Sequence, residues 1–218
     1  MENESMKDKS NKRLFFIIFG TSIVILVFLL LIVFYDYKQK SSVNDYKNSA
    51  DTSIISQEKA AFEEFVGKQA PAFELENIEG SIIRMKDFKN KNIILFFNEG
   101  SMCYPSCWNQ IAQLSNDQRF NNDNVASFSI VVDPKERWQE IIKKVPQMSL
   151  AKILFDNSRA VSSAYHTLYL QSSMHKGSLP GHTYFIINKE GIIKYVLDDP
   201  SMAINNDKLA SELDKLIV

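Results

Sequence analysis

The chain begins with a polar stretch and then becomes almost entirely apolar for several turns. The 22 positions from Leu14 to Tyr35 carry no charged side chain. At about 1.5 Å of rise per residue, a helix of this length reaches roughly 33 Å, which is enough to cross a hydrocarbon core of about 30 Å. A helix buried in a globular core would keep a polar face, and this run is apolar all round. The pattern predicts a transmembrane helix over residues 14–35.

The flanks of this run distinguish an uncleaved anchor from a signal peptide. The apolar region of a signal peptide is about 7–15 residues long and ends in small residues, whereas this run is longer and continues into Asp36 and Lys38. Basic residues favour the cytoplasmic side. Four precede the run and three follow it: Lys7, Lys9, Lys12 and Arg13, then Lys38, Lys40 and Lys47. We expect a cytoplasmic tail over residues 1–13, a single-pass membrane anchor and an extracytoplasmic C-terminal domain.

After the apolar run, the composition changes twice. Residues 36–61 are rich in Ser, Asn, Asp and Lys and show little apolar periodicity, which is typical of a flexible tether. From Phe62 to Val218 apolar residues recur in regular patterns, over a length usual for one domain. We therefore expect one globular domain over residues 62–218.

Within that domain, the hydrophobic pattern predicts strands that alternate with helices. Asn92–Phe97 is a nearly continuous apolar run, as in a strand buried on both faces. One helix is expected to open near Cys103 and another just after Pro134. The remaining expected strands are Phe73–Glu76, Ser81–Met85, Val125–Val132, Ile153–Phe155, Thr183–Asn188 and Ile192–Leu197, and the remaining helices are Ser158–Leu168 and Lys208–Ile217. The order predicts an α/β fold with a mixed central sheet flanked by helices.

Composition and charge exclude several functional classes. Hydrophobic residues make up 45% of the chain and charged residues 23%, which is the composition of a globular protein. The formal net charge is −1, and no stripe of Lys and Arg with interleaved aromatic residues is present. We therefore expect no nucleic-acid partner.

The two cysteines of the chain, Cys103 and Cys107, are separated by only three residues. They follow a predicted buried strand, and the carboxyl ends of such strands are where α/β proteins build their sites. Residues four apart on a helix lie on one face, close to the separation that a disulfide needs. A helix N-terminus also stabilises a thiolate. A purely structural staple over so short a loop would restrict the unfolded chain little, so the pair predicts redox or metal chemistry.

Three segments resemble the redoxin branch of the thioredoxin superfamily, which includes the peroxiredoxins of the alkyl hydroperoxide reductase and thiol-specific antioxidant type. They are Val66–Leu75 (VGKQAPAFEL), Ile83–Lys91 (IRMKDFKNK) and Pro180–Gly191 (PGHTYFIINKEG). They stand in the order that the family shows. The resemblance implies a thioredoxin-like fold, with Pro180 as the candidate for a cis-proline that faces the active cysteines.

The same resemblance implies roles for the residues around the pair. By analogy with thioredoxins, Cys103 attacks and Cys107 resolves the mixed disulfide. By analogy with peroxiredoxins the order reverses, because Cys107-Trp108-Asn109-Gln110 resembles their Cys-x-x-Glu; we favour Cys103. Peroxiredoxins carry Thr or Ser three residues before the attacking cysteine, where this chain has Gly100 or Tyr104. Ser101 is the candidate for the missing hydroxyl, and Trp108 for shielding the sulfur.

Two functions of different class remain open. The first is a membrane-anchored thiol–disulfide oxidoreductase that works with a thiol or disulfide protein partner, needs no cofactor, and extends to peroxide reduction. The second is a copper-delivery protein, since copper proteins of oxidase assembly resemble this chain in fold and in cysteine spacing. Two thiolates and an imidazole suit copper, and the imidazole candidate is His182, with His175 behind it. Glu99 is interpreted as a solvated loop carboxylate.

Overall fold

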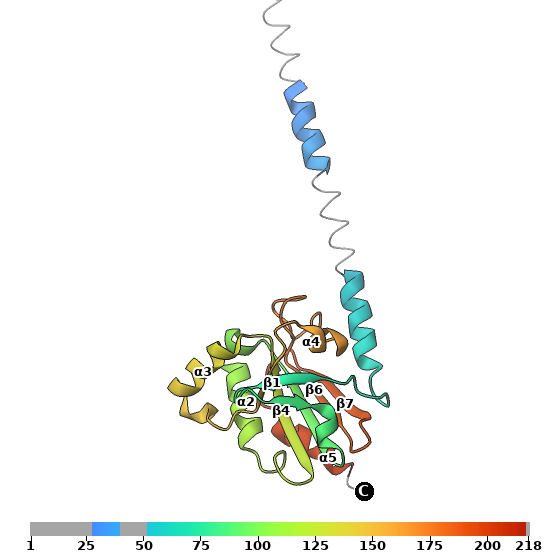
Figure 1. The fold of residues 1–218 in the computed structure, drawn as a ribbon. Helices are drawn as coiled ribbons and strands as arrows, with labels where there is room; N and C mark the ends of the chain where they lie inside the picture. Colours follow the sequence, from blue (N-terminus) through green and yellow to red (C-terminus); the bar gives the residue numbers. More distant parts are fainter. Residues whose placement is uncertain (1–27, 40–51, 217–218) are drawn as a thin grey trace, which may run out of the picture. The chain divides into compact units, whose positions relative to one another are not determined.

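The computed structural model describes residues 28–39 and 52–216 (Figure 1). The predicted tail over residues 1–13, most of the predicted anchor and residues 40–51 of the predicted tether lie outside the described residues. Residues 28–39 are helical, and the apolar side chains from Phe28 to Tyr35 are exposed. Among the helices of the two described ranges, none has the length and apolar character needed to cross a membrane.

The globular unit spans Ile54–Val218 and begins earlier than the sequence predicted. The flexible tether was expected to reach residue 61, but residues 52–63 form a helix. Its last turn carries Phe62, which is 3% exposed. The rings of Phe62 and Phe65 both meet the ring of Phe185 edge-on. Aromatic burial of this kind holds the helix against the sheet.

A seven-stranded mixed sheet forms the centre of the unit, in the order β2-β1-β5-β4-β3-β6-β7. β3, β4 and β5 are parallel, and the remaining neighbouring pairs are antiparallel. The strands are β1 (Glu74–Asn77), β2 (Ile82–Arg84), β3 (Asn92–Phe97), β4 (Val125–Val131), β5 (Ile153–Phe155), β6 (Thr183–Ile187) and β7 (Ile193–Asp198). The predicted mixed α/β sheet is confirmed.

Every residue of β3 is buried, because β3 lies between β4 and β6 in the middle of the sheet. Successive side chains of a strand point to opposite faces. Ile93, Leu95 and Phe97 therefore join the core on one face, while Ile94 and Phe96 join the core on the other. This double burial explains why the sequence of β3 is apolar throughout.

The helices divide between the two faces of the sheet (Figure 1). The face with Ile94 is covered by helices whose residues Ile111, Trp138 and Leu209 belong to its core. The opposite face is covered by the helix over residues 52–63 and by the segment around α4. These helices are α2 (Ser106–Asn116), α3 (Lys135–Lys144), α4 (Ala160–Ala164) and α5 (Asn206–Asp214), and the 3-10 segments are η1 (Met85–Phe88), η2 (Gly100–Met102) and η3 (Pro146–Met148).

Two helices differ from the sequence prediction. The helix expected over Ser158–Leu168 is only the short α4, since Arg159 and His166 on either side adopt positive φ values of 62° and 52°. Left-handed residues interrupt a right-handed helix. The helix expected near Cys103 begins later, at Ser106, because the preceding residues form the 3-10 segment η2.

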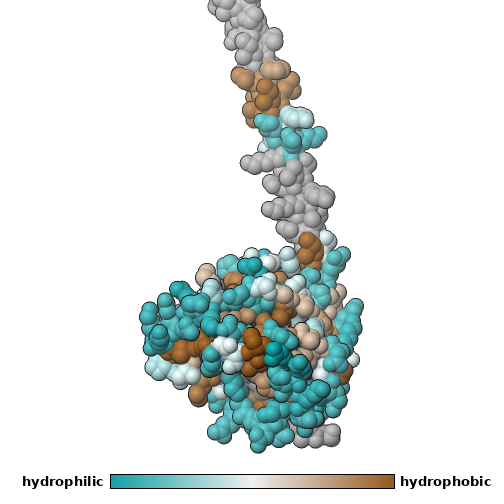
Figure 2. Space-filling model, in the orientation of Figure 1, coloured by the Kyte–Doolittle hydropathy of each residue, from teal (hydrophilic) through white to brown (hydrophobic). Residues whose placement is uncertain are grey.

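The surface of the globular unit is mainly hydrophilic in the view of Figure 2, with smaller hydrophobic areas between the polar side chains. Exposed large apolar side chains of this unit include Met102, Tyr104, Leu150 and Met174. Two of them, Met102 and Tyr104, flank Cys103 in the sequence.

Candidate redox site

The two cysteines form a disulfide at the start of α2, in the segment that follows β3. Their Cα atoms are 5.3 Å apart, within the range that a disulfide requires. Cys103 precedes α2, and Cys107 lies in its first turn. The two differ in access, because Cys103 is partly exposed and Cys107 is 0% exposed. Of the two cysteines, Cys103 is therefore the one that retains contact with solvent.

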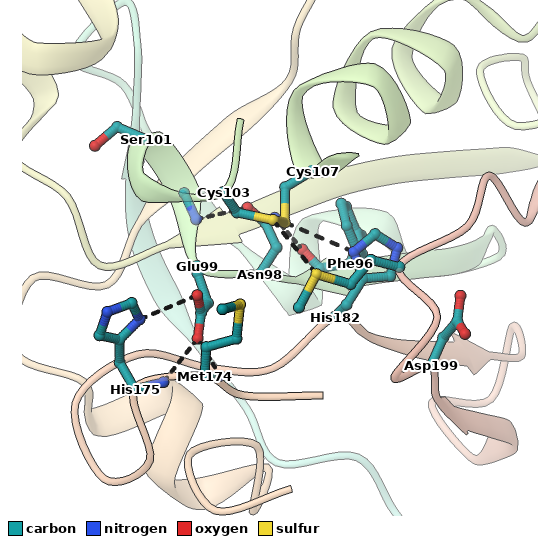
Figure 3. The surroundings of a disulfide bond; sticks show 12 residues. Phe96, Asn98, Glu99, Ser101, Cys103, Cys107, Met174, His175, His182 and Asp199 are labelled. Atoms are coloured by element: carbon teal, nitrogen blue, oxygen red, sulfur yellow. Dashed lines mark hydrogen bonds and ion pairs between the residues drawn. A yellow bond between two sulfur atoms is a disulfide. The ribbon is translucent and has the colours of Figure 1, made fainter. Parts of the chain in front are cut away.

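Asp133, which follows β4, fixes the chain before Cys103. Its carboxylate accepts hydrogen bonds from the Ser101 amide at 2.9 Å, the Ser101 hydroxyl at 2.6 Å and the Trp138 indole at 2.9 Å. Gly100 has a φ of +63°, and a Cβ there would lie 1.8 Å from Asp133 Oδ2. The Ser101 hydroxyl thus points away from the disulfide (Figure 3).

Glu99 is a buried structural anchor and not the solvated loop carboxylate that the sequence predicted. Its side chain is 2% exposed. It accepts hydrogen bonds from the Met174 amide at 2.6 Å and from the His175 amide at 3.0 Å, and His175 Nδ1 lies 3.1 Å away. These contacts fasten the loop around Met174 beside the disulfide (Figure 3). The prediction was wrong because those partners come from a loop more than seventy residues away in the sequence.

His182 is the histidine that meets the cysteines. It immediately precedes β6, whose antiparallel register pairs Thr183 with Phe97 at the end of β3. The His182 ring is fully buried, and its Nδ1 lies 3.6 Å from Cys107 Sγ. Its Nε2 lies 2.7 Å from the Tyr184 hydroxyl and 3.2 Å from the Ala203 carbonyl. A carbonyl only accepts, so that contact places the hydrogen on Nε2 and leaves Nδ1 free.

Burial lowers the pKa of His182 to about 4, against 6.5 for a histidine in water, although Asp199 and the Ala203 carbonyl act in the opposite direction. The imidazole is therefore neutral at physiological pH beside the oxidised pair. Burial also raises the pKa of Tyr184, so its hydroxyl stays protonated.

A turn after β7 closes the other side of the pair. Asp199 accepts hydrogen bonds from Ser201, Ala203 and Asn205. Burial tends to raise the pKa of Asp199, but these hydrogen bonds outweigh it and the pKa is lowered. Met202 on this turn has a φ of +50°, and its Sδ lies 3.9 Å from Cys103 Sγ.

The predicted metal-ligating trio is brought together. One ligand atom each from Cys103, Cys107 and His182 lies within 4.8 Å of the others. His175, the second candidate, is instead engaged by Glu99. Thiolate and imidazole ligands match a soft metal such as Cu(I), once the disulfide is reduced.

The other predicted site residues are placed less directly. Pro180 is buried in the loop before β6, but its peptide bond is not the cis bond of the described chain, which instead joins Tyr104 to Pro105. After Pro180, the Gly181 amide donates a hydrogen bond to the Thr167 carbonyl, and the chain continues directly into β6. A trans peptide bond is compatible with this path. Trp108 packs against Tyr104 and Trp138, with ring centroids 5.0 and 5.9 Å away.

Several residues of the site were missed in the sequence. Asp133 carried a usable signal, because it stands just past the carboxyl end of a predicted strand, where α/β sites are built. Met202, Asp199 and Tyr184 carried none, since ordinary positions on a strand and a turn look the same in sequence.

The chain matches a known protein-family model. The model of the AhpC/TSA family matches residues 66–196, which is more than half of the chain and includes both cysteines and His182. No curated protein matches the sequence.

Solved structures agree on the fold. Peroxidoxin BcpB from Mycobacterium tuberculosis aligns with a TM-score of 0.58 and 19% identity, over 69% of this chain and 97% of that one. AhpC from the same organism aligns with a TM-score of 0.60 and 18% identity, over 70% of this chain and 98% of that one. A yeast mitochondrial 1-Cys peroxiredoxin, whose thiol resolving mechanism is described as working via glutathione/thioredoxin systems, aligns with a TM-score of 0.59 and 20% identity. The alignment covers 70% of this chain and 76% of that one. The chain therefore belongs to the AhpC/TSA family, as a peroxiredoxin-like thiol oxidoreductase with a thioredoxin-like fold.

Proposed function

We propose that this chain exchanges disulfides with a thiol-bearing protein partner, with Cys103 as the attacking and Cys107 as the resolving cysteine. The unequal access of the two sulfurs carries the proposal. Cys103 is partly exposed, whereas Cys107 is fully buried beside His182. Of the two cysteines, only Cys103 has contact with solvent, the side from which a partner sulfur would approach.

The reaction takes two steps. In the reduced chain, the Cys103 thiolate attacks a partner disulfide, forms a mixed disulfide and releases the partner's other sulfur as a thiolate. The Cys107 thiol then loses its proton and attacks the Cys103 sulfur, which restores the intramolecular disulfide and releases the second partner thiolate. The partner gains two electrons and the chain loses two. A thiol reductant reverses these steps and regenerates the dithiol.

His182 is suited to accept the proton that Cys107 loses. Its free Nδ1 faces the Cys107 sulfur at 3.6 Å, and Nε2 is held by the Ala203 carbonyl and the Tyr184 hydroxyl. A neutral imidazole in this position is a general base. The imidazolium that forms would sit beside a thiolate, and the attraction between the two charges offsets part of the burial cost.

A redox titration of the full-length chain tests this function. Thiols are counted by mass spectrometry after equilibration in glutathione buffers of graded ratio. We expect both cysteines to pass together between dithiol and disulfide at one potential. His182→Gln is expected to slow release of a preformed mixed disulfide about 100-fold, which is within the usual contribution of a general base, and Thr183→Val, at the next position, is the matched control. A pair that stays oxidised at every ratio would contradict the proposal.

Peroxide reduction is a more specific activity within the family, and the geometry supports it less than it supports thiol–disulfide exchange. The Ser101 hydroxyl is engaged by Asp133, so it does not serve a peroxide at the sulfur. We propose that exchange with protein thiols is the main reaction. Peroxide consumption by the reduced chain, measured beside exchange, should be slower; a faster peroxide reaction would reverse this order.

Copper binding is the second candidate, because two cysteine sulfurs and an imidazole nitrogen converge within 4.8 Å. It requires the reduced pair. In competition with a Cu(I) chelator, a copper carrier would show tight binding that His182→Ala abolishes. Binding no tighter than that of an unstructured dithiol, or binding indifferent to this substitution, would exclude the role.

We also propose that residues 14–35 anchor the protein in a membrane with the redox unit outside the cytoplasm. The charge-free run and the basic residues before it support this placement, and a disulfide persists more easily in an oxidising compartment. Carbonate extraction of membranes and protease accessibility of the globular unit test it. Release by carbonate, or protection from external protease in intact cells, would refute it.

A further inference from the structure

A hollow lies at the end of the sheet away from the disulfide. A cavity of about 550 Å³ is lined by the first residues of β4 and β5, Val125 and Ile153. The disulfide follows the last residue of the parallel strand β3, so the two sites lie at opposite ends of these strands. The volume is within the range of about 300–1,000 Å³ that small-molecule sites occupy.

Most of the wall of this cavity is apolar. It includes Ile78, Phe88, Phe128 and Leu154. Phe128 and Leu154 belong to the buried core, and Phe88 packs edge-on against Phe128 with ring centroids 5.0 Å apart. The part of the wall that belongs to the core is therefore closely packed.

Two ammonium groups stand beside this wall. Lys152 Nζ donates to Asn121 Oδ1 at 2.8 Å, and Lys91 Nζ donates to the Asn122 carbonyl at 3.1 Å. Both lysines line the cavity, and neighbouring residues hold their ends. Each ammonium has three donors, so each can still donate to a ligand.

Neither ammonium has an anionic partner. The ion pairs among residues 52–216 involve other cations, and no described carboxylate lies within 4 Å of Lys91 or Lys152. Glu79, the acidic residue of the lining, is exposed and pairs with neither. Burial lowers the pKa of Lys152, and the charge of Lys91 lowers it further. A negative charge at this position would favour the protonated lysine and so oppose both effects.

We propose that this cavity binds a monoanion with an apolar body, such as an aryl- or alkylcarboxylate, whose head group is held by Lys91 and Lys152. The apolar part lies along Phe88 and Phe128. The paired lysines supply charge complementarity, and the apolar wall supplies affinity that is independent of charge.

Methyl NMR of the full-length chain tests the proposal with 4-phenylbutyrate as the probe and 4-phenylbutanol as its uncharged counterpart. We expect the Ile78, Ile153 and Leu154 methyl signals to shift saturably with the carboxylate, and the signal of Ile111 in α2, which does not line the cavity, to stay in place. The alcohol should bind about tenfold more weakly or worse, because it lacks a charge-assisted hydrogen bond.

Lysine variants then separate the head-group site from the apolar wall. Lys152→Met and Lys91→Met should each weaken binding of the carboxylate several-fold and together at least about tenfold, with the methyl spectrum otherwise retained. Lys208→Met, at an exposed lysine of α5, is the matched control and should bind as the parent chain does. Equal binding of acid and alcohol, indifference to the double substitution, or no saturable shift would each overturn the proposal.

Discussion

The burial of His182 makes a quantitative prediction about acid stability. The unfolded chain takes up a proton at this imidazole near pH 6.5, whereas the folded chain resists it until about pH 4. Between these values the unfolded state binds more protons, so falling pH favours unfolding. Stability is thus fully present above the unfolded pKa and is lost as pH falls toward the folded pKa.

The size of the effect follows from the two values. One pKa unit corresponds to about 1.4 kcal/mol, so the shift of His182 amounts to about 3 kcal/mol in full. Most of this, about 2 kcal/mol, should develop between roughly pH 7 and roughly pH 4.5. Replacing His182 by Gln removes the titrating group while it keeps a polar side chain next to Cys107 and Tyr184.

Urea unfolding of the oxidised full-length chain, followed by tryptophan fluorescence, measures this difference at both pH values. The stability lost on acidification should be about 2 kcal/mol smaller in His182→Gln than in the parent chain. Thr183→Val is the matched control, because its buried hydroxyl has no partner within the described chain and does not titrate. Equal losses in parent and His182→Gln would refute the reasoning that burial keeps this imidazole neutral.

Three further predictions concern the elements that support the disulfide. Gly100→Ala should destabilise the chain by about 2 kcal/mol or more, because the left-handed backbone and the contact with Asp133 both oppose a Cβ; calorimetry measures this, and an unchanged melting temperature would contradict it. Glu99→Gln should lower the free energy of unfolding by roughly 1–3 kcal/mol through weaker hydrogen bonds to Met174 and His175. It should also speed amide hydrogen exchange in that loop; unaltered exchange would show that Glu99 does not hold the loop in place. Asp133→Asn, which retains the size of the side chain, should lower stability by about 1–2 kcal/mol, with urea unfolding as the assay. Unchanged stability would show that Asp133 does not support the site.

The sequence predicts the centre of the fold better than its periphery. β3 was predicted residue for residue as Asn92–Phe97, and β5 as Ile153–Phe155. Both are short apolar runs between polar segments, and burial on two faces requires such a pattern. The helix expected over Ser158–Leu168 failed because its ends depend on backbone conformations that apolar periodicity does not report.

The site was only partly visible in the sequence for a similar reason. The cysteine pair is local, so its spacing reveals it. The contact between Cys107 and His182 depends instead on the register of β6 against β3 across 75 residues. Glu99 could not be distinguished from a solvated carboxylate, because its partners lie in a distant loop. Pairing between distant segments is a property of the folded sheet and not of any one segment.

The claim that Cys103 is the attacking cysteine has a direct measurement. Reduced Cys107→Ser and Cys103→Ser variants of the full-length chain are mixed with 5,5′-dithiobis(2-nitrobenzoate), and the rate of thiolate release is followed. Cys107→Ser should react at least about tenfold faster and retain a stable mixed disulfide at Cys103, because exposure governs attack. A faster reaction of Cys103→Ser, or equal rates for the two variants, would contradict the account.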